Sequence, residues 1–168
     1  IMMKILSIAT LLLCINLKGS SQTVKKDSIR AYKYEGSIVD GKKTGNATCY
    51  YPNGDRYEGN FANDTMNGTG TMYYFDGKRY EGEWKNGLRN GKGRLYWGNG
   101  DMYDGDFANN EMHGKGEIKW TNGERYEGDF VHNDRTGEGT YYWENGDKYV
   151  GHFDKNVRNG KGICYYEN

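Results

Sequence analysis

The fold is decided by the stretch Tyr80-Glu81-Gly82-Glu83-Trp84-Lys85-Asn86-Gly87, because its pattern recurs through most of the chain. One tyrosine opens each copy, and successive copies are 23 residues apart, at Tyr34, Tyr57, Tyr80, Tyr103, Tyr126 and Tyr149. A glycine stands two positions after each tyrosine, and a large apolar residue stands two positions after that glycine. A fixed period of this length is typical of repeat architectures, so the sequence predicts six consecutive structural units.

Each unit contains two runs with the spacing of β-strands. Tyr126, Gly128 and Phe130 alternate with acidic residues, which is the period of two expected of a strand. Residues 139–143 form a second alternating run, and the polar residues between the two runs suit a loop.

Asn-Gly or Asp-Gly pairs close the units, as at Asn53-Gly54 and Asp76-Gly77. Such a pair is typical of a tight primed turn, in which both central residues have positive φ. We therefore predict strand, loop, strand and primed turn in every unit. Twelve strands in sequence order give an all-β fold, an elongated single-layer antiparallel sheet of six consecutive 23-residue β-hairpin repeats.

Strand alternation assigns the side chains to two faces. The tyrosine, glycine and large apolar residue of the first strand share an apolar face with second-strand residues and with a late aromatic row: Cys49, Met72, Leu95, Ile118, Tyr141, Cys164, and Tyr51, Tyr74, Trp97, Trp120, Trp143, Tyr166. The opposite face carries an acidic row and a tyrosine row, which Lys119 interrupts: Glu35, Glu58, Glu81, Asp104, Glu127, and Tyr50, Tyr73, Tyr96, Tyr142, Tyr165.

These units resemble the MORN repeat (membrane occupation and recognition nexus), whose pattern runs Tyr-Glu-Gly-Glu-Trp-x-x-Gly-x-x-x-Gly-x-Gly. Residues 80–93 agree with it at every defined position. The resemblance covers residues 34–168, as 34–56, 57–79, 80–102, 103–125, 126–148 and a truncated 149–168. It implies an elongated single-layer sheet. It also implies roles in membrane apposition, protein–protein assembly and scaffolding, or as an accessory domain beside an enzyme.

The N-terminal segment differs in kind from the repeats. Lys4, an apolar run over residues 5–17 and the small residues Gly19 and Ser21 predict a signal peptide over 1–21, cleaved after Ser21. A lipoprotein signal ending at Cys14 is the alternative, which the large residue before that cysteine disfavours. We expect a secreted or periplasmic protein, with residues 22–33 as a linker. Because the last unit is incomplete, we also expect a continuation beyond Asn168.

Charge and cysteine placement limit the partners. The chain has 23 basic and 23 acidic residues, and this balance argues against a nucleic-acid partner. Cys49 and Cys164 occupy the same position in the first and last units, which places them about 48 Å apart along the predicted sheet. A disulfide cannot span that distance. The two cysteines are therefore expected to be free thiols, or to join two chains as a homodimer.

No residue pattern predicts catalysis, a cofactor or a metal site. The Gly-Lys-Gly triplets at 91–93, 114–116 and 160–162 lack the longer loop and following helix of a phosphate loop. The histidines His113, His132 and His152 stand at three different repeat positions without metal-ligand spacing. The acidic row is nearly the same in every unit, which indicates a structural ladder and no single catalytic carboxylate. We therefore expect that the chain is not an enzyme.

Two surfaces are candidates for binding. The tyrosine row, Tyr50, Tyr73, Tyr96, Tyr142 and Tyr165, suits contacts with a protein partner or a sugar, and the alternative is cross-strand pairing that stabilises the hairpins. Basic residues predicted in loops could line one edge and contact lipid headgroups: Lys43, Arg89, Lys92, Lys115, Arg135, Arg158 and Lys161. Solvated loop charges are the alternative for these residues.

Three functions remain open at this point. The leading one is a non-catalytic scaffold for protein–protein interaction in the cell envelope or outside the cell. The second is a peripheral module that binds phospholipid headgroups. The third is an accessory domain of an enzyme that lies beyond the C-terminal residue of this sequence.

Overall fold

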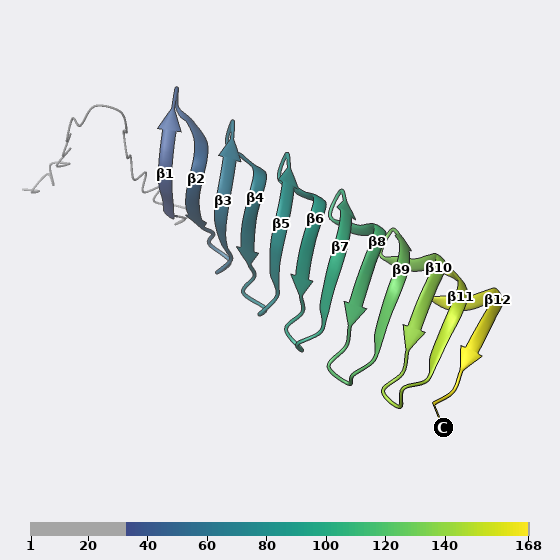
Figure 1. The fold of residues 1–168 in the computed structure, drawn as a ribbon. Coiled ribbons are helices and arrows are strands. Elements are labelled where there is room, and N and C mark those ends of the chain that lie inside the picture. The colour runs from purple at the N-terminus through teal and green to yellow at the C-terminus, as the bar shows by residue number, and fades with distance from the viewer. Residues whose placement is uncertain (1–32, 168) are drawn as a thin grey trace, which may run out of the picture.

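The computed structural model describes residues 33–167, which form one antiparallel β-sheet (Figure 1). Its twelve strands stand in chain order, and each pairs only with its neighbours in the sequence. Figure 1 shows the strands side by side along an elongated, twisting ribbon, with no second layer over the described residues. The predicted all-β, single-layer fold is confirmed.

Each unit consists of a seven-residue strand followed by a nine-residue strand. The first strands are β1 (Lys33–Val39), β3 (Arg56–Ala62), β5 (Arg79–Lys85), β7 (Met102–Ala108), β9 (Arg125–Val131) and β11 (Lys148–Asp154). The second strands are β2 (Lys42–Tyr50), β4 (Thr65–Tyr73), β6 (Leu88–Tyr96), β8 (Glu111–Lys119), β10 (Asp134–Tyr142) and β12 (Val157–Tyr165). The predicted signal peptide over 1–21 lies outside the described residues, as does the predicted linker over 22–33 except for Lys33.

A tyrosine ring lying on two glycines is the packing unit of the sheet. Gly82 of β5 pairs with Gly93 of β6, and the Tyr80 ring lies across both. A Cβ atom at Gly93 would come within 2.4 Å of Tyr80 Oη. The Tyr80 hydroxyl donates to the Glu83 carbonyl, 2.9 Å away. Every unit repeats this hydrogen bond from its tyrosine to the carbonyl three residues later.

The tyrosines continue into an aromatic ladder along the ribbon. The Tyr80 ring centroid lies 5.0 Å from that of Trp84 in its own unit and 5.0 Å from that of Phe107 in the next, both edge to face. Similar contacts run from Tyr34 to Phe153. Edge-to-face pairs contribute about 0.5–1.5 kcal/mol beyond the burial of their area. We call this side of the sheet the aromatic face and the other side the polar face.

The core is therefore a single layer of side chains on the aromatic face. Its central tyrosines, Tyr57, Tyr80, Tyr103 and Tyr126, have no exposed surface at all. Among the described residues, the polar groups of buried side chains are the tyrosine hydroxyls, the indole N–H of Trp84 and the thiol of Cys49, and no buried side chain is charged. Each unit buries its rings against its neighbours, so each hairpin depends on the next for stability.

A bulge in each second strand explains the second repeated glycine. Between the pairs Gly82–Gly93 and Trp84–Arg89, three residues of β6 stand opposite one residue of β5. Gly91, in this bulge, has a φ of 99°, and the equivalent glycines also have positive φ. The Gly-Lys-Gly triplet of this unit is thus a bulge glycine followed by the glycine beneath the tyrosine.

The primed turns lie at positions that differ from the prediction. They fall inside the units, where both residues of each two-residue loop have positive φ: Asp40-Gly41, Asn63-Asp64, Asn86-Gly87, Asn109-Asn110, His132-Asn133 and Lys155-Asn156. At the closing Asn53-Gly54 pair only Gly54 has positive φ, at 90°. The predicted primed turn at the closing pairs is therefore wrong.

The closing pairs form longer loops for a local reason. Gly54 N–H donates to the Tyr51 carbonyl and Tyr51 N–H to the Asp55 carbonyl, which defines a three-residue loop built on a type I turn. The Asn53 side chain stabilises this turn, because its Oδ1 accepts the Asp55 N–H at 3.2 Å and its amide donates to the Asp55 carboxylate at 2.8 Å.

Hydrogen bonds join neighbouring units at both edges of the ribbon. At the primed turns, Asn110 N–H donates to the Arg89 carbonyl at 3.0 Å, and its Oδ1 accepts the Arg89 N–H at 2.9 Å. At the opposite edge, Asp101 Oδ1 accepts the Thr121 N–H at 2.9 Å. These links fix the position of each hairpin relative to the next.

The two cysteines of the sheet are not bonded to each other. Cys49 lies in β2 and is buried, whereas Cys164 lies in β12, at the other end of the ribbon, and is exposed. The prediction that they form no intramolecular bridge is confirmed.

Replacing Gly93 with alanine is expected to destabilise the array by about 1–3 kcal/mol, because the new Cβ overpacks the Tyr80 ring. Denaturant unfolding monitored by circular dichroism measures this. Lys92→Ala is the control, since it removes only an ion pair of an exposed side chain and should cost about 0–1 kcal/mol. Equal effects of the two substitutions would contradict the packing described here.

The free energy of unfolding is expected to fall above pH 10, because tyrosines that are buried in the folded state ionise more readily once the chain unfolds. Burial raises the pKa of Tyr57 and of Tyr126 from 10.0 to about 12, and it raises the pKa of Tyr80 and Tyr103 in the same direction. The unfolded chain therefore loses these protons at lower pH than the folded chain does. Melting temperatures measured between pH 8 and 12 should be flat below pH 10 and then drop, and a flat profile throughout would refute the effect.

Candidate interaction faces

The tyrosine row on the polar face alternates with basic residues of the first strands, except at Met102. Arg79 pairs across the strands with Tyr73 on one side and Tyr96 on the other. Its guanidinium lies 4.2 Å from the centroid of the Tyr96 ring, within the range of a cation–π contact. The same contact joins Arg56 to Tyr73 at 4.3 Å.

Further along the row, Arg125 lies 3.5 Å from the Tyr142 ring centroid. Lysines replace arginine at the two ends of the row, at Lys33 over Tyr50 (5.6 Å) and Lys148 over Tyr165 (5.0 Å).

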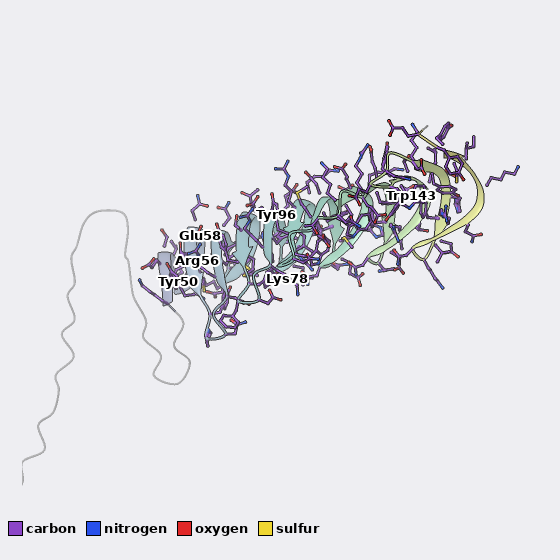
Figure 2. All side chains as sticks on the ribbon, turned by 90° about the horizontal axis from the view of Figure 1, so that it is seen from below. Tyr50, Arg56, Glu58, Lys78, Tyr96 and Trp143 are labelled. Atoms are coloured by element: carbon purple, nitrogen blue, oxygen red, sulfur yellow. The ribbon has the colours of Figure 1, made fainter. Side chains whose placement is uncertain are left out.

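The acidic row neutralises these cations. Arg56 Nε lies 3.1 Å from Glu58 and Arg79 Nε lies 2.9 Å from Glu81. Figure 2 shows Tyr50, Arg56 and Glu58 close together at the N-terminal end of the sheet, with Tyr96 further along the ribbon. The cross-strand pairing alternative for the tyrosines agrees with these contacts, and partner binding by the row remains a prediction.

Lys119 interrupts the tyrosine row together with a second exchange. At the second-strand position that pairs with the acidic row, this unit has Glu117 where other units have threonine, arginine or isoleucine. Lys119 Nζ lies 2.9 Å from Glu117, and Arg125 Nη1 lies 3.1 Å from it. The lysine thus compensates a carboxylate that would otherwise face two acidic neighbours, Asp104 and Glu127.

The basic residues predicted to lie in loops along one edge lie in strands, on both faces. On the aromatic face are Lys43, Arg89, Arg135 and Arg158, which pair with Ile38, Trp84, Phe130 and Phe153. On the polar face are Lys92, Lys115 and Lys161. The predicted loop placement is wrong because the turns are only two residues long and the second strand begins directly after them. Lipid contact by these residues remains a prediction.

The two sets of cations differ in their partners. Lys92 forms an ion pair with Asp106 at 2.7 Å, and Lys115 pairs with Asp129 at 2.6 Å. Arg89 lies instead over the Phe107 ring, 5.3 Å from its centroid. Within residues 33–167, neither Arg89 nor Arg135 nor Arg158 forms an ion pair with a carboxylate.

The late aromatic row lines a series of depressions on the aromatic face. Two of them, of about 460 and 390 Å³, share Lys78, Trp97 and Met112 and so form one continuous groove. We call this the central groove and define it by the residues Tyr74, Leu95, Trp97, Met112, Ile118 and Trp120. Burial raises the pKa of Tyr74, whose ring forms one end of the groove.

Tyr141 closes the other end of the central groove. At this repeat position the other units have Cys49, Met72, Leu95, Ile118 or Cys164. The Tyr141 ring lies between the two tryptophans, 5.5 Å from Trp120 and 5.2 Å from Trp143, and with Trp143 it lines a separate depression of about 310 Å³. Its hydroxyl donates to Glu124 at 2.9 Å, and burial together with this carboxylate raises its pKa to about 12.

Sequence reasoning does not predict the central groove. It assigns the lining residues to the correct face, but the depth of a groove depends on the size of every neighbouring side chain. The one available signal is Tyr141, which is the only aromatic residue at its repeat position.

The repeats of the sheet are matched by the family model for the MORN repeat. It matches six consecutive segments, at residues 34–56, 57–79, 80–102, 103–125, 126–148 and 149–168. The chain belongs to the MORN repeat family. No curated protein matches the chain in sequence.

Two solved structures resemble the MORN array weakly. One is the TCP10c domain of Drosophila melanogaster Sas-4, with 17% identity, 73% of this chain and 93% of that chain covered, and a TM-score of 0.35. The other is the SAS-4 (dCPAP) TCP domain in complex with a proline-rich motif of Ana2 (dSTIL), also of Drosophila melanogaster. Its identity is 14%, the coverage is 95% of this chain and 99% of that chain, and the TM-score is 0.31. Scores this low do not establish a common fold for the two proteins.

The MORN array shows no metal-binding arrangement over residues 33–167. The nearest grouping of histidines is His132, whose Nδ1 lies 2.6 Å from Glu111, and His113, whose ring centroid is 6.1 Å from that of His132. His113 lies in β8, and His132 lies in the turn that follows β9. In the same part of the chain, no helix is long and apolar enough to cross a bilayer.

Replacing Tyr96 with threonine is expected to lower the melting temperature of the MORN array, because it removes the ring that stacks on Arg79. The expected loss is about 0.5–1 kcal/mol. Tyr165→Thr is the matched control, since Tyr165 lies in the edge strand β12, is 47% exposed and has a lysine ammonium 5.0 Å from its ring centroid in place of a stacked arginine. A larger loss for the control than for Tyr96→Thr would argue against the stacking role.

Proposed function

We propose that this protein is a non-catalytic scaffold in the cell envelope or outside the cell, and that it holds a protein partner on the aromatic face of its sheet. Membership of the MORN repeat family supports a repeat scaffold for protein or membrane interaction. The choice of face rests on the central groove. This hollow is lined by partly buried aromatic side chains and by buried apolar ones. Aromatic residues in such hollows are the usual anchors of protein interfaces.

The charge arrangement favours a protein partner over a lipid surface. A lipid-binding module needs several cations on one exposed surface. Here the basic residues are divided between two faces, and the side chains of Lys92 and Lys115 are paired with aspartates. The polar face is also occupied by ion pairs and cation–π contacts, which leave few groups free for a partner.

The location outside the cytoplasm rests on the predicted signal peptide over residues 1–21. Its support is the sequence alone, namely Lys4, the apolar run and the small residues before Ser21. Sequencing the N-terminus of the protein purified from its native host tests it directly, and a chain that retains residues 1–21 would refute cleavage.

Site-specific photo-cross-linking in the native host tests the choice of face and partner. A photoreactive phenylalanine analogue replaces Trp97 in the central groove or, as the control, Tyr50 on the polar face. Tyr50 is 37% exposed, so the control position is open to solvent. Protein adducts from position 97 and not from position 50 are expected.

Adducts from position 50 alone would contradict the proposal. Failure at both positions, together with binding of the purified protein to anionic vesicles that is lost at high salt, would favour the membrane alternative.

A further inference from the structure

We infer that the central groove binds a segment of its partner in the polyproline II conformation, with an apolar residue at every third position. This rests on the proposed function and specifies the partner's chemistry. Three observations carry it: the spacing of the aromatic side chains, the donors that line the groove, and the guanidinium of Arg89, which has no carboxylate partner.

The spacing of the groove follows from the architecture of the sheet. Tyr74, Trp97 and Trp120 stand at the same position of successive two-strand units. Adjacent strands lie about 4.8 Å apart, so successive rings recur about every 9.6 Å along the ribbon. An occupant lying along the groove therefore meets an equivalent aromatic side chain at each such interval.

A polyproline II segment has nearly the same period. It has three residues per turn and rises about 3.1 Å per residue, so equivalent side chains recur about every 9.3 Å. Two turns of an α-helix advance about 10.8 Å, a larger mismatch. Three residues of a β-strand advance about 9.9 Å, but the third residue then points to the opposite side. Of the regular conformations, polyproline II alone repeats the same face in step with the rings.

The groove also offers hydrogen-bond donors to the carbonyl groups of such a segment. Polyproline II has no internal hydrogen bonds, so its carbonyl groups need donors from a partner. The indole N–H groups of Trp97 and Trp120 donate to no acceptor within residues 33–167, whereas that of the buried Trp84 donates to the Gly70 carbonyl at 3.1 Å. Leu95, Met112 and Ile118 supply apolar surface between the rings.

Charge adds a preference for an acidic residue in the occupant. Arg89 lines the margin of the groove on the side of the primed turns, and its guanidinium donates to the Asn110 carbonyl but forms no ion pair with a carboxylate in the described part of the chain. On the other margin, Lys78 is already paired with Asp76 at 2.7 Å. A carboxylate on the occupant is therefore expected to lie toward Arg89.

The length of the occupant is set by the two ends of the groove. Tyr74 and Trp120 are two ring intervals apart, about 19 Å, which corresponds to about six residues of polyproline II. Beyond Trp120 the Tyr141 ring lies against the Trp120 ring, 5.5 Å away, and separates the central groove from other depressions that Trp143 lines. The neighbouring Trp143 therefore lies outside the groove although it holds the same repeat position as Trp97.

Peptide titration of the full chain, followed by calorimetry, tests the inference. The probe is a peptide about nine residues long, with leucine at every third position, one central glutamate and proline elsewhere. In one control peptide glycine replaces each proline, and in the other glutamine replaces the glutamate. We expect the glycine peptide to bind about tenfold more weakly or worse, because it is not preorganised, and the glutamine peptide to bind several-fold more weakly.

Variants of the protein locate the site. Trp97→Ala is expected to weaken binding of the proline probe about tenfold or more. Trp143→Ala, the same change at the same repeat position outside the groove, should leave binding unchanged. Circular dichroism confirms that each variant is folded, and the peptide controls on the unaltered protein test the inference even if Trp97→Ala does not fold.

Several outcomes would overturn the inference. These are equal binding of the proline and glycine peptides, equal loss in Trp97→Ala and Trp143→Ala, or preference for an amphipathic helical peptide or for cellohexaose over the proline probe. If such a result accompanies protein cross-links from position 97, the scaffold proposal stands and only the polyproline II occupant is rejected. If position 97 gives no protein cross-link and no peptide binds, both are rejected.

Discussion

A tyrosine ring lying flat on a pair of glycines is the contact on which the rest of the structure depends. Because Gly82 and Gly93 have no side chains, the Tyr80 ring can approach the backbone of two strands at once. The ring then presents its edges and faces to Trp84 and to Phe107 of the next unit. A sheet only one strand layer thick can in this way bury aromatic rings completely without a second layer to cover them.

This contact also makes the two faces of the sheet chemically different. The aromatic face holds the buried rings and the central groove, while the polar face holds the alternating ladder of tyrosines and basic residues with its acidic partners. The aromatic ladder runs from Tyr34 to Phe153, whereas the polar ladder is interrupted at Met102 and Lys119, where Lys119 is paired with Glu117. The two faces are therefore distinguished along the ribbon by departures from the repeat, of which Tyr141 is the clearest.

The sequence predicts the strands and the faces well because both follow from strict periods. Spacing of 23 residues and alternation of two place Tyr80, Trp84 and Leu95 on one side without knowledge of any distance.

The turns are harder to predict, since Asn53-Gly54 suits either a primed two-residue turn or a three-residue loop, and the hydrogen bonds of Asp55 decide between them. The wrong placement of Arg89 in a loop has the same origin. The connection between the two strands of a unit is expected from the sequence to be longer than two residues, and a longer connection would include the arginine. The groove is beyond sequence reasoning because it depends on the combined volumes of side chains from several units.

The order of the strands has a mechanical consequence. Because β1 to β12 pair strictly with their sequence neighbours, the hydrogen bonds between strands lie along the long axis of the ribbon. Tension applied between the two ends of the array therefore separates adjacent strands one pair at a time. The hydrogen bonds of a strand pair break in succession, whereas under shear they would all resist the load together. Such a ribbon should yield at low force and in small steps, each releasing one strand or hairpin, and it should close again by the same steps when the load is removed.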